Sequence, residues 1–155
     1  MNKLKLSLLL FSLLLLPLCI FSQQAEMSIS EQFRQDTARI ESKFRASTDY
    51  STMGMIAANI ELEDDYDVLL NKYYKILLST LNGEGKKILI ESQRNWIKLR
   101  DSDQKVIGML REKAYEEAGG GSIWGIVSSG AFTDITKQRV IQIFNFLMFD
   151  NLSGE

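Results

Sequence analysis

The chain has 155 residues, with 18 basic and 20 acidic side chains, a single cysteine, Cys19, and no histidine. The absence of histidine excludes Ser–His–Asp and Cys–His catalysis, most zinc chemistry and the usual general base at neutral pH. What remains for an enzyme is carboxylate or lysine chemistry. We expect neither a cofactor nor a bound metal, and we favour a protein that is not an enzyme.

Residues 1–22 have the pattern of a secretory signal peptide. Two lysines precede an apolar run over 6–21, and cleavage after Ser22 would leave 133 residues, enough for one domain with a single core. A retained membrane anchor is the alternative, because the run approaches the length that spans a bilayer. Pro17 near its end favours cleavage. We predict a periplasmic or secreted protein, with membrane contact only through an uncleaved signal segment.

Removing this segment changes both the charge and the cysteine content of the chain. The mature chain would carry 16 basic and 20 acidic residues, a net charge of −4, and no cysteine. This charge argues against nucleic acid, whose phosphates need a basic face, and is compatible with a basic protein partner. Without disulfides, packing alone must hold the domain together. A lipid attached to Cys19 is a weaker alternative, because Leu18 precedes it where a small residue is expected.

A first helix is predicted over about 30–46. Ser28 and Glu31 have the spacing of a capping box, and the apolar residues that follow recur at helical intervals, at Phe33, Ile40 and Phe44. The polar stretch STDYSTMG then ends the helix.

Two long helices are predicted next. Apolar residues spaced close to 3.6 positions apart indicate a second helix starting near Met53, whose buried stripe would contain Ile56, Ile60, Tyr66, Leu69, Leu70, Tyr73, Leu77 and Leu81. The turn NGEG (82–85) makes its successor antiparallel. That third helix should run over about 85–117, with a buried stripe of Leu89, Trp96, Leu99, Val106 and Leu110.

The last helical stretch follows GGGS (119–122), with Ser122 as a plausible N-cap. Its apolar residues include Ile123, Val127, Ile135, Phe144, Phe146 and Leu147. Gly125 and Gly130 weaken its first half, so it forms either one helix or two pieces joined near 130–133. No alternation typical of strands is sustained after the signal. The fold class is therefore all-α, an antiparallel bundle of four to five helices with two long central helices.

The segment QRNWIKLRD (93–101) is the most unusual polar stretch. On a helix, Gln93, Trp96 and Arg100 share the face that carries the apolar stripe, so Arg100 should lie at the border of the core. An unpaired buried charge costs roughly 3–5 kcal/mol, and Asp67 on the preceding helix is the expected partner of Arg100. This interpretation makes the segment an interhelical polar clamp; a recognition surface is the functional alternative.

Two other features suggest chemistry without establishing it. Asp64, Asp65 and Asp67 could serve glycan hydrolysis only beside a second acid roughly 5–10 Å away, and their spacing is that of a solvated helix face. The segment GGGSIW (119–124) could cradle an anion, but it lacks the lysine and spacing of a phosphate loop. A turn between two helices explains it as well, and Trp124 either fills the core or forms a recognition edge.

Four segments occur in the order and spacing of one known family: DVLLNKYYKILL (67–78), QRNWIKLRD (93–101), GGSIW (120–124) and TDITKQRV (133–140). Over about 53–143 the chain resembles the small secreted helical domains named for the mycobacterial lysozyme inhibitor LprI. The family pattern falls on Asp67, Leu70, Asn71, Tyr74, Gln93, Trp96, Arg100, Asp101, Gly120, Gly121, Ser122, Gln138 and Arg139.

This resemblance implies a helical domain of the bacterial envelope, with lysozyme inhibition attributed to one branch. It also implies cysteines near Ala58, Gln104 and Ala131, which this chain lacks. A missing disulfide forgoes roughly 2–4 kcal/mol, so packing must compensate or the fold is looser near 119–122.

Together these observations predict a signal peptide (1–22), an N-terminal helix and linker (23–52) and an LprI-like helical domain (53–150). We expect a binding protein that inhibits lysozyme-type muramidases, with GGGSIW a better contact loop than NGEG. An envelope assembly domain with another partner is the alternative, and a carboxylate-based glycan hydrolase is less favoured. The candidate binding residues are Asp67, Asn71, Tyr74, Gln93, Trp96, Arg100, Asp101, Gly121, Ser122, Trp124 and Arg139.

Overall fold

The computed structural model describes residues 27–153, so the predicted signal peptide and its cleavage site lie outside the described residues. The chain divides into two units, Met1–Gln32 and Phe33–Glu155. In the first unit, the described residues start helix α2 (Ile29–Arg45). The Ser28 hydroxyl accepts a hydrogen bond from the backbone N–H of Glu31 at 3.2 Å, as a capping box requires.

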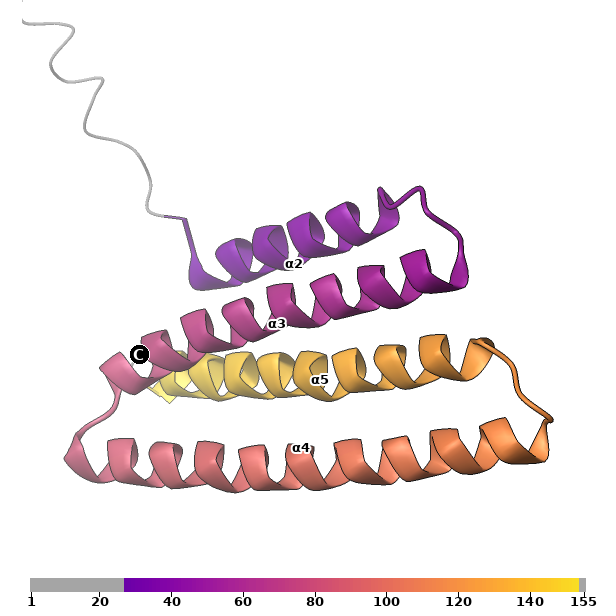
Figure 1. Ribbon diagram of the computed structural model, residues 1–155. Helices are drawn as coiled ribbons and strands as arrows, with labels where there is room; N and C mark the ends of the chain where they lie inside the picture. The colour runs from indigo at the N-terminus through magenta and orange to yellow at the C-terminus, as the bar shows by residue number, and fades with distance from the viewer. Residues whose placement is uncertain (1–26, 154–155) are drawn as a thin grey trace, which may run out of the picture. The chain divides into compact units, whose positions relative to one another are not determined.

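Three further helices follow α2: α3 (Thr52–Thr80), α4 (Gly83–Glu117) and α5 (Ile123–Ser153). Side chains cap two of them, because Ser51 accepts from the N–H of Gly54 and Asn82 from that of Gly85. Successive helices from α3 to α5 run in opposite directions (Figure 1), and the described residues contain no strand. The predicted all-α antiparallel bundle is confirmed, and α5 is one continuous helix.

The core lies between α3 and α5, the two helices that pack most closely. Its buried apolar and aromatic side chains include Tyr66, Leu69, Leu70, Tyr73 and Leu77 of α3 and Val140, Ile143 and Leu147 of α5. The predicted stripe of α3 is therefore confirmed in its second half, whereas Ile60 is exposed.

The glycine in the first turn of α5 lies where α3 packs close to this helix. A Cβ atom at Gly125 would lie 2.8 Å from Cδ1 of Ile56, so this position lets α3 approach closely. One turn further on, the Asn59 side-chain amide donates to the Ser129 hydroxyl at 2.9 Å, and the Thr133 hydroxyl donates to the Asn59 carbonyl at 3.0 Å. This polar seam ties α3 to α5 near the level where family cysteines were expected.

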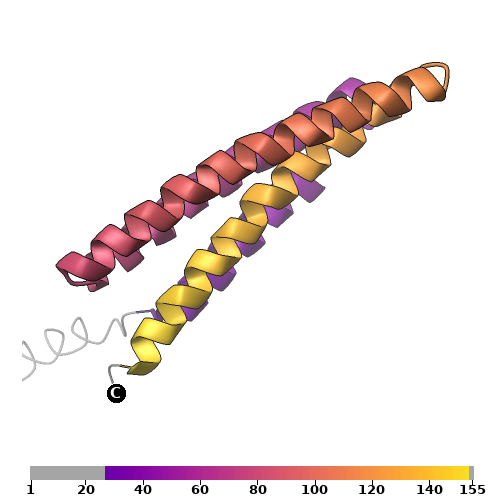
Figure 2. The same ribbon diagram turned by 90° about the horizontal axis from the view of Figure 1, so that it is seen from below.

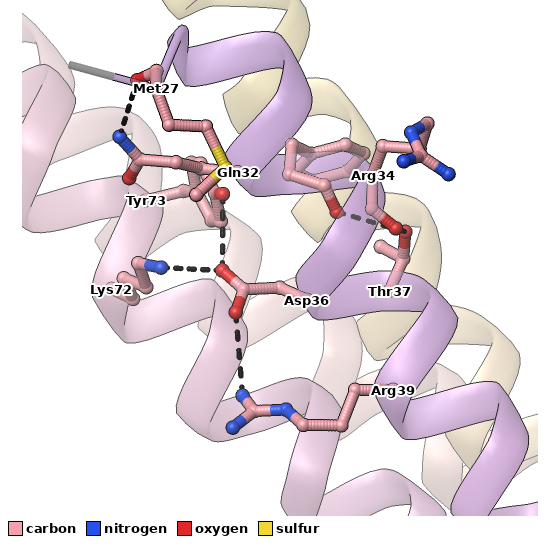
Figure 3. Close-up of polar contacts among 9 residues, drawn as sticks. Met27, Gln32, Arg34, Asp36, Thr37, Arg39, Lys72 and Tyr73 are labelled. Atoms are coloured by element: carbon pink, nitrogen blue, oxygen red, sulfur yellow. Dashed lines mark hydrogen bonds and ion pairs between the residues drawn. The ribbon is translucent and has the colours of Figure 1, made fainter. Parts of the chain in front are cut away.

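From Phe33 onward, α2 is attached to α3 and α5 by rings and ion pairs. Phe33 stacks on Phe144 with centroids 3.9 Å apart and meets Tyr73 edge-on at 5.0 Å. Figure 3 shows Asp36 between Lys72 and Tyr73, with both groups bonded to its carboxylate.

A second polar cluster lies nearby, where Glu41 accepts hydrogen bonds from Tyr66 and Lys137, both at 2.5 Å. The hydrogen bond from Lys137, followed by that from Tyr66, holds the pKa of Glu41 below its usual value. Burial, followed by the bond to Glu41, raises the pKa of Tyr66 to about 12.

Helix α4 contradicts part of the sequence prediction. Leu89 is its buried residue, Trp96 is half-buried, and Leu99, Val106 and Leu110 are 50–58% exposed. The expected buried stripe is therefore wrong over most of its length, because α4 lies at the edge of the helices, with α5 beside it and one side open (Figure 2). In α5, Ile123, Val127 and Phe146 are likewise exposed. Within the described residues, no helix combines the length and apolarity that crossing a bilayer requires.

Candidate functional site

Arg139 is the centre of a polar cluster between α4 and α5. Its Nε donates to Oε1 of Gln93 at 3.0 Å, its Nη2 to the Ser92 hydroxyl at 3.1 Å and its Nη1 to Oε1 of Gln142 at 2.6 Å. The residue is only 4% exposed, and none of these partners is negatively charged. Burial lowers the pKa of Arg139, while nearby Tyr74 on α3 opposes the shift. The guanidinium is thus the centre of a clamp whose hydrogen-bond acceptors are all neutral.

Trp96 lies beside this clamp with a guanidinium near it from each of two helices. The guanidinium carbon of Arg100 is 5.3 Å from the ring centroid, and that of Arg139 is 5.6 Å away. Both distances are within the range of cation–π attraction. The predicted grouping of Gln93, Trp96 and Arg100 on one face is therefore present, with Arg139 joining it from α5.

The expected ion pair between Asp67 and Arg100 is wrong. Arg100 bonds instead to the adjacent Asp101, with Nη2 to Oδ1 at 2.9 Å, and Asp67 accepts from the side-chain amide of Asn71 at 3.0 Å. Arg100 instead interacts electrostatically with Glu63 of α3, one turn before Asp67. Burial raises the pKa of Glu63, and Arg100 acts against that shift. The polar clamp of the sequence prediction exists, but the buried arginine is Arg139.

The loop between α4 and α5 forms a second candidate site. Gly119, Gly120 and Gly121 all have positive φ angles, of 68°, 103° and 126°, so glycine suits each position. Ser122 then bonds to Thr52 at the start of α3, with 3.0 Å between the hydroxyl oxygens. The loop is thereby fixed against α3.

A hollow of 420 Å³ opens beside this loop, between the start of α3, the end of α4 and the start of α5. We call the loop and its surroundings the tip, defined by residues 119–124 with Met53, Arg111, Glu112, Tyr115 and Glu116. Trp124 is one of the residues that line the hollow, and its Nε1 atom is buried without a hydrogen-bond partner among the described residues. Such orphaned donors are rare in folded proteins.

The aspartates considered for glycan hydrolysis do not form an enclosed pair. Asp64 is exposed, and Asp101 is half exposed and neutralised by Arg100. Asp67 is engaged by Asn71. Residues 27–150 also contain no cluster of three acidic, histidine or cysteine side chains suited to a metal ion. The site chemistry is that of hydrogen bonding and apolar contact.

A family model for the lysozyme inhibitor LprI matches residues 42–143. The chain belongs to the LprI family. The match covers two thirds of the sequence and extends from the end of α2 into α5, so most of α2 lies outside the LprI domain. No curated protein and no solved structure matches the chain.

The candidate binding residues fall into three groups. Gln93, Trp96, Arg100 and Arg139 meet between α4 and α5, Tyr74 faces them from α3, and Asp67 with Asn71 forms a separate pair on α3. Gly121, Ser122 and Trp124 belong to the tip.

Sequence reasoning missed the remaining ligands of Arg139. Ser92 precedes the QRNW segment directly, and Gln142 lies one helical turn after Arg139. The (i, i+3) spacing of Arg139 and Gln142 was the available signal.

Proposed function

We propose that this protein is an exported helical binding protein that inhibits lysozyme-type muramidases. Its membership of a family of lysozyme inhibitors carries this conclusion. The predicted signal peptide and the predicted division into residues 1–22, 23–52 and 53–150 are consistent with a periplasmic or secreted domain. Mass spectrometry of the exported protein should find Gln23 as its first residue.

The tip is the proposed contact surface. Met53, Tyr115 and Ile123 are each more than half exposed there, and Glu112, Glu116 and Glu117 border them. An apolar and aromatic centre with a charged rim is the usual anatomy of a protein interface. Arg111 and Lys113 pair with Glu112 and Glu117, which leaves an excess of acidic groups at this rim. Lysozymes of the common kind are basic, so this acidic rim favours their approach.

The hollow supplies a place for a side chain or loop of the partner. The rings of Trp124 and Tyr115 offer aromatic walls to a group that enters it. Arg139 cannot take this role, because its guanidinium is buried and already bonded. We therefore assign the Arg139 cluster to stability and the tip to recognition.

A turbidity assay with lysozyme and cell walls tests the proposal. The wild-type protein should slow clearing of the walls, and Tyr115→Ala should raise the concentration needed for half inhibition by about tenfold or more, which is the effect of losing a central anchor. Val68→Ala, which truncates an exposed apolar residue elsewhere on α3, should leave it unchanged. Absence of protection at a large molar excess of wild-type protein removes the inhibitor function.

The acidic rim has its own test. Glu116→Lys should slow association with lysozyme and weaken its dependence on salt, whereas Glu84→Lys at the opposite end of α4 should change neither. Equal effects of the two substitutions would place the contact away from the tip.

A further inference from the structure

An apolar stripe runs along the open side of α4. Leu99, Val106 and Leu110 follow one another at steps of seven and four, which places them on one side of a helix. They are 58%, 50% and 52% exposed, and Ile88 near the start of α4 is 62% exposed. Sequence periodicity of this quality normally marks a face that is covered.

Helix α5 continues this apolar surface. Trp96 of α4 and Ile135 and Ile141 of α5 line a shallow groove of 510 Å³, together with Gln138, Gln142 and Asn145. A second depression of 460 Å³ joins Ile88 of α4 to Phe146 and Phe149 of α5. We call the combined surface the outer face, defined by Ile88, Leu99, Val106, Leu110, Ile135, Ile141, Phe146 and Phe149.

We propose that the outer face is the interface of a homodimer. Seven of its apolar side chains are 38–73% exposed. At roughly 200 Å² for a whole large side chain, these seven offer roughly 700 Å² of apolar surface. The largest apolar patch on an ordinary monomer is about 300–600 Å², and a stable interface takes about 800 Å² from each partner. The outer face thus has the size of a subunit interface.

The charge of the outer face favours a second copy as its occupant. A twofold contact brings residues near their own copies, so a strongly charged centre would repel itself. Apart from Arg139, the polar residues that line the groove are neutral amides, Gln138, Gln142 and Asn145. Amides both donate and accept hydrogen bonds and so can pair with their copies. Arg139 is buried beneath them and bonded internally. The charges bordering the stripe on α4 are of both signs, at Glu91, Lys98, Asp103 and Lys113.

The outer face and the tip share none of their defining residues. Either proposal can therefore fail without the other.

Sedimentation equilibrium of the purified chain tests the dimer. The wild-type chain should have twice the monomer mass at tens of micromolar, and Val106→Lys should shift it to monomer. The matched substitution Val68→Lys, at a 70% exposed valine of α3, should leave the dimer intact. Circular dichroism should show equal helix content in all three chains. A monomeric wild-type chain at several hundred micromolar, or equal effects of the two lysines, would overturn the proposal.

The fluorescence of Trp96 tests the position of the interface independently of the apolar stripe on α4. Trp96 and Trp124 are the two tryptophans of the chain, so Trp124→Phe leaves Trp96 in the groove as the single reporter. Its emission should shift to longer wavelength on dilution as water enters the groove, and the shift should be absent when Val106→Lys is added. A dimer whose Trp96 emission does not change on dissociation would place the interface elsewhere and overturn the assignment.

Discussion

Replacing Arg139 by methionine should cost little stability, whereas replacing one of its neutral partners should cost more. Removing the guanidinium loses three hydrogen bonds to a charged group, each worth about 1.5–3 kcal/mol. It also relieves the penalty of several kcal/mol for burying the charge. The groups left behind are uncharged, and Ser92, Gln93 and Gln142 are all at least partly exposed, so water can bond to them. We expect Arg139→Met to change the free energy of unfolding by less than about 1 kcal/mol.

Gln93→Leu has the opposite character, because it leaves the buried cation with one acceptor fewer. We expect it to lower the free energy of unfolding by about 2 kcal/mol, and to cost almost nothing when Arg139→Met is already present. Urea denaturation followed by far-ultraviolet circular dichroism measures all four chains, and the coupling energy should be about 1.5–2 kcal/mol. A loss above about 3 kcal/mol for Arg139→Met, or additive effects of the two substitutions, would refute a clamp whose charge is merely tolerated.

Four further substitutions test the contacts of α2, the helix glycines and the tip loop. The pKa of Glu41 is lowered in the folded state, so its contribution to stability is present above its ordinary pKa and is lost as the pH falls. Below about pH 5, the free energy of unfolding should therefore decline less steeply in Glu41→Gln than in the wild-type chain. Acid titrations of both chains measure this difference. Gly108→Ala, with no atom within 4 Å of the new Cβ, should stabilise α4 by about 0.5–1 kcal/mol. Gly125→Ala, whose Cβ would meet Ile56 at 2.8 Å, should instead destabilise by about 1 kcal/mol in the same urea assay. Gly120→Ala should lower the melting temperature, because φ is +103° there.

The helices were predictable because their signals are local. Helix ends are indicated within a few residues by the pair Ser28 and Glu31 and by the NGEG turn. The apolar stripe from Tyr66 to Leu77 is long enough to identify the buried side of α3. The continuity of α5 was left open for a physical reason. Gly125 and Gly130 look like helix breakers until α3 is known to approach them.

The burial of α4 was not predictable by the same means. Periodicity identifies an apolar face, as it did for Leu99, Val106 and Leu110, but it does not say whether another part of the chain covers that face. Whether the face is covered depends on how far apart the long helices lie, and the residues of α4 alone do not determine that distance.

Within the polar cluster, sequence reasoning located the segment and mistook the arginine. Arg100 and Arg139 both belong to the pattern that the resemblance implied, and a border guanidinium needs partners in either case. Which of them turns inward depends on the rotation of α4 and α5 about their axes. Arg100 also reaches its immediate neighbour Asp101, although side chains one residue apart point in different directions on a helix.

Because α4 has a single buried residue, we expect it to unfold locally more readily than the other long helices. Leu89 and the Arg139 hydrogen bonds hold a helix of 35 residues, whereas α3 buries six side chains over 29 residues. Deuterium should therefore enter the backbone of α4 through partial opening, well before it enters α3 and the second half of α5, which exchange only when the whole domain unfolds.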